Sequence, residues 1–152
     1  MRVSAKTDYA LRAAAELAAA EGKGHVKGEQ IAHAQGIPPR FLENILLELR
    51  HAGLVQSQRG VEGGYWLARP AAEITLAEVI RAVEGPLANV RGTRPESVEY
   101  EGAAAPLRLV WVAVRASLRG VLESVTLADL ARGELPSSLD ELLADPEAWR
   151  SH

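Results

Sequence analysis

The sequence contains no cysteine. A chain without thiols forms no disulfide, presents no thiolate nucleophile and offers no cysteine ligand to zinc or to an iron–sulfur cluster. Histidine, another common metal ligand, occurs four times, and no two histidines stand four residues apart, a spacing that would place both on one helix face. We therefore expect neither a metal nor a cofactor.

Long apolar runs are absent as well. No stretch reaches the roughly 18 apolar residues that a membrane-spanning helix needs. Lys6, Asp8 and Arg12 interrupt the N-terminal segment, where a secretory signal would be apolar. We therefore expect a cytoplasmic protein without a membrane partner. Apolar residues make up 47% of the chain, which is enough to build a core.

The motifs of enzyme active sites are also missing. The sequence shows no paired carboxylates, no nucleophile with a neighbouring base and no cluster of metal ligands. The glycine-rich stretch at 60–64 lacks the lysine and the following helix of a phosphate-binding loop. We expect that the protein is not an enzyme.

Charge is divided unevenly between the two halves of the chain. Residues 1–70 hold nine Lys or Arg against seven Asp or Glu, and residues 71–152 hold eight against thirteen. This asymmetry is typical of a basic working face beside an acidic remainder, and it also arises by chance in surface charge. Charge alone does not separate the two explanations.

The segment from Leu54 to Pro70, LVQSQRGVEGGYWLARP, is the most informative part of the sequence. Two short apolar-rich runs flank a loop with Arg59 and three glycines, and glycine readily adopts the positive φ angles of a tight hairpin turn. The preceding PPRFLENILLELRHAG predicts a helix that starts at proline and stops at Gly53. A helix followed by an arginine-tipped hairpin is the pattern of a winged helix-turn-helix.

Three helices are predicted before the hairpin. They cover residues 7–20, with Thr7 as the N-cap, 28–35 and 39–52, and a tight turn at Gly36 joins the second helix to the third. In a helix-turn-helix the later helix enters the major groove of DNA. The buried stripe of this third helix is predicted at Leu42, Ile45, Leu46 and Leu49.

The outward face of the third helix carries side chains suited to reading bases. Arginine can form two hydrogen bonds with guanine and asparagine two with adenine, while glutamate accepts from cytosine and phenylalanine contacts the thymine methyl. The same polar residues are also compatible with an ordinary solvated face. We predict DNA contacts at Pro38, Arg40, Phe41, Glu43 and Asn44.

Beyond the hairpin, Thr75 and Glu78 form a capping box for a short helix that ends at Gly85. Residues 87–106 show no periodicity and predict a loop. The longest helix is predicted over 107–125, where apolar residues repeat at steps of three and four, as in helices that pair. This stripe indicates a homodimer, unless it only covers the chain's own core, and consists of Trp111, Val114, Leu118, Val121 and Val125.

These elements predict a mainly α-helical fold with a small β-hairpin wing, that is, a winged helix-turn-helix plus a long dimerisation helix. We expect a DNA-binding domain over 1–86, a loop over 87–106, and the dimerisation helix with short C-terminal helices over 107–152. The capping residues Thr126 and Ser138 begin those short helices.

The chain resembles the IscR/NsrR/CymR family of bacterial winged-helix regulators, also called the Rrf-two family. The resemblance covers nearly the whole chain, through MRVSAKTDYALRAAAELA, QGIPPRFLENILLELRHAGLVQSQRG, GGYWLARP, EITLAEVIRAVEGPL and SVTLADL in the family's order. It implies a homodimer joined through the long helix, with the third helix in a major groove and Arg59 in a minor groove. It also implies DNA contacts of the wing at Arg59 and Gly60, with supporting wing positions at Ser57, Gly63, Gly64 and Tyr65.

We accordingly expect a transcription regulator and repressor, associated with the nucleoid, that binds an imperfect palindrome in double-stranded DNA. Half-sites read by a symmetric dimer lie about 34 Å apart. Phosphate contacts supply most of the affinity, and we expect them from Arg2, Lys6, Lys27, Arg50 and Arg69. The alternative is a protein-interaction module that acts with an enzyme partner, with DNA binding weak or lost.

Family members commonly sense through a [2Fe–2S] or [4Fe–4S] cluster, held mainly by cysteines in the loop before the long helix. Here the loop 87–106 has no cysteine, and Arg12 stands where a cluster-binding relative has histidine. Asp8 matches a carboxylate ligand of some nitric-oxide-sensing members, but one carboxylate cannot hold such a cluster alone. We therefore expect no iron–sulfur cluster.

The effector is then expected to be a small molecule or a partner protein. One hypothesis places a small-molecule pocket between the first helix and the long helix. Alternatively, the loop is a surface segment without a role and Trp111 belongs to the dimer contact. The pocket would be lined by Asp8, Tyr9, Arg12, Tyr100, Arg108 and Trp111.

Overall fold

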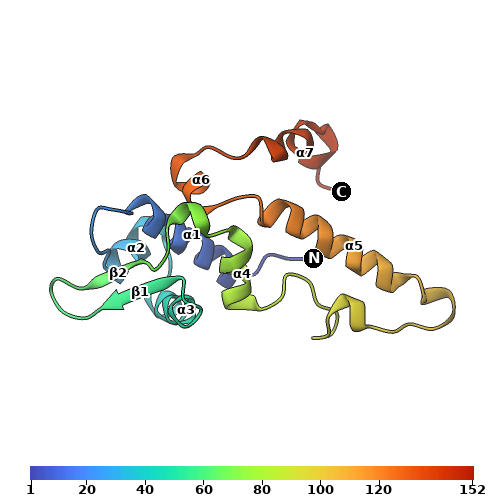
Figure 1. Cartoon of the computed structure of the whole chain (residues 1–152), viewed down its shortest axis with the longest axis horizontal. Coiled ribbons are helices and arrows are strands. Elements are labelled where there is room, and N and C mark those ends of the chain that lie inside the picture. Colours follow the sequence, from blue (N-terminus) through green and yellow to red (C-terminus); the bar gives the residue numbers. More distant parts are fainter.

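Seven α-helices and one two-stranded hairpin make up the chain, which the computed structural model describes from residue 1 to residue 152 (Figure 1). This confirms the predicted fold class. The elements are α1 (Ala5–Ala19), α2 (Gly28–Gln35), α3 (Pro39–His51), β1 (Val55–Gln58), β2 (Gly64–Leu67), α4 (Leu76–Glu84), α5 (Leu107–Leu122), α6 (Leu127–Arg132) and α7 (Asp140–Ala144). Short 3-10 helices lie at Ala71–Glu73, Pro95–Ser97, Gly102–Ala104, Ser137–Leu139 and Pro146–Trp149.

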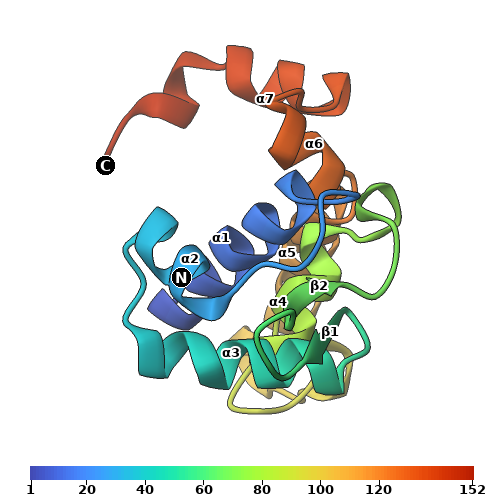
Figure 2. The same ribbon diagram turned by 90° about the vertical axis from the view of Figure 1, so that its left-hand side faces the viewer.

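Helix α1 runs through the middle of the core because its inward side chains are small. Ala10, Ala13 and Ala14 are buried, and small side chains let neighbouring helices approach closely. Figure 2 shows α1 between α2, α3 and α4. Helix α3 faces it with the predicted stripe of Leu42, Ile45, Leu46 and Leu49, and all four are at most 1% exposed.

The start of α1 differs from the prediction. Ser4 is the N-cap, and its Oγ accepts a hydrogen bond from the backbone N–H of Thr7 at 3.0 Å. Thr7 lies inside the first turn and is buried against α4, where its Oγ1 donates to Glu84 at 3.1 Å. Both Ser4 and Thr7 are good capping residues, and only the packing of α4 decides between them.

The hairpin pairs β1 with β2 in antiparallel register, from Val55 opposite Leu67 to Gln58 opposite Gly64. A Cβ added to Gly63 would lie 2.1 Å from the carbonyl oxygen of Gln58, so the turn requires glycine there. Val26 pairs with Tyr65 through two backbone hydrogen bonds of 2.9 and 2.8 Å. The hairpin is therefore attached to the body of the chain through residues 25–27.

Helix α6 returns to the N-terminal body although it follows α5 in sequence. The backbone of Leu127 donates to Ile74 at 2.9 Å, and the side chain of Leu127 is fully buried in the core. The predicted cap at Thr126 is confirmed, since its Oγ1 accepts from Asp129 at 3.2 Å. The cap at Ser138 is wrong, because that residue lies in a 3-10 turn and α7 has no side-chain cap. Residues 127–132 therefore pack with residues 1–86 rather than with α5.

Helix α5 leads away from this body, and residues 87–106 run alongside it (Figure 1). No residue of α5 is buried within one chain. The helix ends at Leu122, earlier than predicted, so Val125 is not part of its apolar stripe. Instead Val125 is 2% exposed and its carbonyl accepts a hydrogen bond from Leu76 at 2.9 Å, which joins it to the core. No helix of the chain is both long and apolar enough to cross a bilayer.

Candidate nucleic-acid interface

The start of α3 is exposed on one side and anchored on the other. Pro38 is the N-cap and Pro39 the first helical residue, whose fixed φ suits a helix start and whose missing N–H costs nothing there. Ile37 just before them is buried and holds the turn to the core. Because a helix repeats every 3.6 residues, the buried stripe that begins at Leu42 occupies one face of α3, and the residues between its members point to solvent. The predicted base-reading residues Pro38, Arg40, Phe41, Glu43 and Asn44 are all exposed.

Helix α1 supports this exposed end through a chain of contacts. The ring of Tyr9 meets Phe41 edge-on, with centroids 6.1 Å apart. The Arg12 guanidinium lies 4.9 Å from the Tyr9 ring centroid and donates to the backbone carbonyl of Gln35 at the end of α2 at 2.6 Å. Asp8 binds Arg12 at 3.0 Å. These side chains therefore fix the helix-turn-helix geometry.

The wing is held by residues 25–27. The Lys27 ammonium donates to the carbonyl of Gly60 at 2.6 Å. The His25 ring stacks on Trp66 with centroids 4.0 Å apart, and its Nδ1 lies 3.0 Å from the carbonyl of Glu62. Sequence reasoning proposed Lys27 only as a phosphate contact and missed His25, because no local pattern connects this segment to a hairpin thirty residues later.

The predicted phosphate-binding residues fall into three groups. Lys27 lies at the wing, and Arg50, at the end of α3, donates to Ser57 in β1 at 3.0 Å, so both stand beside the hairpin. Lys6 and Arg69 form ion pairs of 2.9 and 2.8 Å with carboxylates. Arg2 lines a cavity beside Trp111 of α5 and is not grouped with α3 or the wing.

The ion pair between Arg69 and Glu78 shifts the pKa of both groups. The hydrogen bond to Glu78 raises the pKa of Arg69. Burial opposes ionisation of Glu78, but hydrogen bonds from Arg69 and from the Thr75 backbone outweigh it and lower the pKa of Glu78. Arg69 therefore already has a carboxylate partner at the cap of α4.

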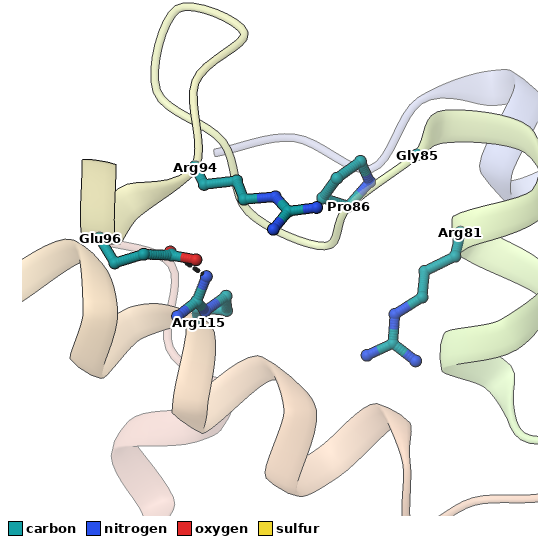
Figure 3. Close-up of a pocket in the computed structure, with 6 residues that line it drawn as sticks. All are labelled: Arg81, Gly85, Pro86, Arg94, Glu96 and Arg115. Carbon is teal, nitrogen blue, oxygen red and sulfur yellow. Dashed lines mark hydrogen bonds and ion pairs between the residues drawn. The ribbon is translucent and has the colours of Figure 1, made fainter. Parts of the chain in front are cut away.

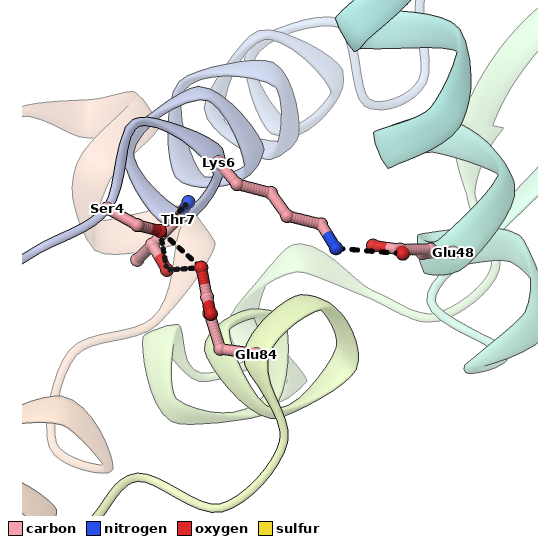
Figure 4. A network of polar contacts seen from close by, with 5 residues as sticks. All are labelled: Ser4, Lys6, Thr7, Glu48 and Glu84. Atoms are coloured by element: carbon pink, nitrogen blue, oxygen red, sulfur yellow. Dashed lines mark hydrogen bonds and ion pairs between the residues drawn. The ribbon is translucent and has the colours of Figure 1, made fainter.

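A second polar network fixes α1 against α3 and α4 (Figure 4). The Glu84 carboxylate of α4 accepts hydrogen bonds from Ser4 and Thr7, and the Thr7 bond measures 3.1 Å. On the other side of α1, Lys6 binds Glu48 of α3 at 2.9 Å. These contacts set the angle at which α3 is presented.

The predicted effector pocket does not exist as one site within a single chain. Asp8, Tyr9 and Arg12 lie beside the turn between α2 and α3. Tyr100 instead accepts a hydrogen bond from Trp111 Nε1 at 3.0 Å beside α5, and Arg108 points to the carbonyl of Glu96 at 3.4 Å. The two groups of residues therefore lie on different parts of one chain.

Comparison with known proteins identifies the family. Residues 3–133 match the Rrf2 (Rrf-two) family, described as "Iron-dependent Transcriptional regulator". A Mycobacterium tuberculosis protein assigned as an HTH-type transcriptional regulator is 50% identical over 151 residues, covering 99% of this chain and 94% of that protein. The HTH-type transcriptional regulator CymR of Bacillus subtilis is 38% identical over 131 residues, covering 86% of this chain and 90% of CymR.

Solved structures agree with this assignment. The structure of CymR, the global cysteine regulator of B. subtilis, has a TM-score of 0.74 at 37% identity and covers 88% of this chain and 98% of that one. The structure of T. potens IscR has a TM-score of 0.70 at 34% identity and covers 100% of this chain and 93% of that one.

The donor set of this chain does not fit an iron site of the kind that the family description suggests. The loop 87–106 offers no thiolate, and nowhere do three or more His, Asp or Glu side chains gather as metal ligands. Iron–sulfur clusters need several soft ligands at bonding distance, and these residues do not supply them. With its winged helix-turn-helix and its match over residues 3–133, the chain belongs to the Rrf2 family of transcriptional regulators.

Proposed function

We propose that the protein acts as a homodimeric repressor that binds an imperfect palindrome in double-stranded DNA. The observation that carries this proposal is the exposed end of α3, which lies on the same body as the hairpin and has its apolar stripe fully buried. Figure 2 shows α3 and β1 along the lower edge of the chain. A recognition helix beside a wing is the geometry that reads a major groove and its flanking minor groove.

In this arrangement each exposed residue has a defined role. Arg40 and Asn44 carry the donors that pair with guanine and adenine, Glu43 can accept from cytosine, and Phe41 can contact a thymine methyl. Arg59, at the tip of the wing, enters the minor groove, where a narrow groove concentrates negative potential. Lys27 and Arg50 bind phosphates on either side of the hairpin.

The proposal of a dimer rests on the uncovered apolar face of α5. Val110 is 49% exposed, and Trp111, Val114, Leu118 and Val121 are only partly covered. Cavities of about 480 and 340 Å³ run between this face and the N-terminal residues Met1 and Arg2. Monomeric proteins rarely leave such a face in water, so a second copy of α5 is the occupant we propose.

We further propose that this regulator works without an iron–sulfur cluster, because its donors do not fit one. Its effector is a small molecule or a partner protein. A repressor of this kind needs only to occupy an operator until the effector lowers its affinity.

Selection of bound fragments from genomic DNA, followed by a gel shift at several salt concentrations, tests the proposal. We expect a palindromic site and an affinity that falls steeply with salt, because bound phosphates release counterions. In the same assay Arg40→Ala should bind the site more weakly, because a base contact is lost. Arg132→Ala, which removes an exposed arginine of α6, is the matched control. A chain that only bound other proteins would show no salt-dependent DNA affinity, and that result would refute the proposal.

A further inference from the structure

A strongly basic cavity lies between α4, the loop 87–106 and α5 (Figure 3). Its volume is about 390 Å³. None of its residues belongs to the DNA-reading face, and Figure 1 shows that the end of α5 near the loop points away from the wing. The lining consists of Arg81, Gly85, Pro86, Arg94, Glu96 and Arg115.

Three guanidiniums from three different elements surround this space. Arg81 comes from α4, Arg94 from the loop and Arg115 from α5, and Figure 3 shows them on different sides of the cavity. Glu96 is the only acidic residue of the lining. The side chains of Arg81 and Arg115 are 40% and 26% exposed, so a solute can reach them.

Carboxylates of the chain satisfy only part of this charge. Glu96 pairs with Arg115, and Glu123 binds Arg81 at 2.7 Å, whereas Arg94 forms no ion pair. Hydrogen bonds from its own backbone N–H and from Arg115 lower the pKa of Glu96, and hydrogen bonds from Arg81 and Arg119 lower that of Glu123. Both acids are thus charged at neutral pH. Because each guanidinium has five N–H donors, most donors around the cavity still lack an acceptor.

The lining decides which kind of ligand fits. Pro86 is the only apolar side chain, so the cavity does not suit an apolar molecule. Its volume is that of a small-molecule site, and a single guanidinium can bind a carboxylate or a phosphate through two parallel hydrogen bonds. We propose that this cavity binds a small metabolite with two anionic groups, phosphate or carboxylate, one held by Arg94 and Arg115 and the other by Arg81.

Such a ligand would connect the DNA-reading body to the dimerisation helix. Arg81 belongs to α4, which packs in the same core as α3, and Arg115 belongs to α5, which carries the uncovered apolar face. A bound anion would fix the position of α5 relative to the body and would change DNA affinity by the same factor by which DNA changes ligand affinity. This coupling, unlike the binding itself, rests on the proposed function.

Isothermal titration of the full-length protein, without DNA, tests the site directly. The probes are inorganic pyrophosphate and succinate at low salt, with acetate as the singly charged control. We expect binding of at least one probe, with Arg94→Gln weakening it about tenfold, since a hydrogen bond to a charged group is lost. Arg91→Gln makes the same change three residues earlier in the loop, outside the cavity, and should bind as the wild type does.

The outcomes separate the possibilities. Binding of pyrophosphate alone assigns a phosphate ligand, binding of succinate alone a dicarboxylate, and binding of both a general dianion site. Absence of binding up to millimolar concentration, or equal weakening by Arg94→Gln and Arg91→Gln, would overturn the proposal. Thermal unfolding of both variants shows that they are folded. A gel shift with the bound probe then tests coupling, so that failure of DNA binding remains distinguishable from failure of the anion site.

Discussion

Arg40 and Arg59 are exposed arginines of the proposed DNA-reading face, and neither takes part in an ion pair of the chain. Lys6 and Arg69, by contrast, already bind carboxylates. A carboxylate bound to a cation compensates part of its charge and occupies some of its donors, so the cation attracts a phosphate less strongly. We therefore expect the two free arginines to contribute more to DNA affinity than the paired cations do.

The Arg59→Ala variant should bind an A·T-rich half-site about tenfold or more weakly, the loss typical of a specific arginine contact. Fluorescence anisotropy with half-sites of differing A·T content measures the effect. Arg132→Ala, which removes an exposed arginine from α6, serves as the control and should bind normally. Equal affinity of wild type and Arg59→Ala would show that the wing does not enter the minor groove.

At the scale of elements, α1 organises the chain by capping and by polar contacts. Ser4 caps α1 and also donates to Glu84, so one side chain closes a helix and connects it to α4. The periodicity of α3 and the capping boxes at Thr75 and Thr126 were readable from sequence and are confirmed, because these signals are local. The cap of α1 was not readable, because Ser4 and Thr7 have similar capping preferences.

The Ser4→Ala variant should lower the free energy of unfolding by about 1 kcal/mol, the usual loss for an N-cap. Urea denaturation followed by circular dichroism measures it. Ser138→Ala is the matched control, because Ser138 caps no helix and should leave the stability unchanged. A Ser4→Ala variant as stable as the control would mean that the cap contributes nothing.

Acid should destabilise the fold partly through Glu78. Its pKa is lowered in the folded chain from the ordinary value of 4.5, so the unfolded chain binds a proton at higher pH than the folded chain does. The stabilisation is complete above pH 4.5 and is lost as the pH falls through the folded-state pKa. Urea midpoints between neutral and acidic pH should decline less steeply in Glu78→Gln than in the wild type. If the urea midpoints of both proteins declined equally, Glu78 would not contribute to the loss of stability in acid.

At the scale of the whole molecule, two functional surfaces lie at opposite ends of the chain. One end of the chain presents α3 and the wing, and the other presents α5 with an apolar face that one chain leaves open (Figure 1). Between them, the loop 87–106 contributes Arg94 to the basic cavity. In the proposed dimer, a ligand in the cavity would contact α4, which packs with α3, and α5, which carries the dimer face.

The Leu118→Glu variant should convert the proposed dimer to a monomer, because burying an unpaired carboxylate between two paired helices is costly. Analytical ultracentrifugation measures the assembly state. Ala116→Glu introduces the same charge at an exposed position of the same helix and should leave the dimer intact. If Leu118→Glu sedimented like Ala116→Glu, the dimer contact would have to lie elsewhere.

The sequence by itself determined the fold class, the buried stripe of α3 and the family, because apolar periodicity, capping residues and turn glycines act over a few neighbouring residues. Tertiary structure decided that Val125 belongs to the core and that, within one chain, the two halves of the predicted effector pocket lie apart. It also brought Arg81, Arg94 and Arg115 to one cavity. These outcomes depend on how distant segments pack against one another, and no local pattern of residues encodes those distances.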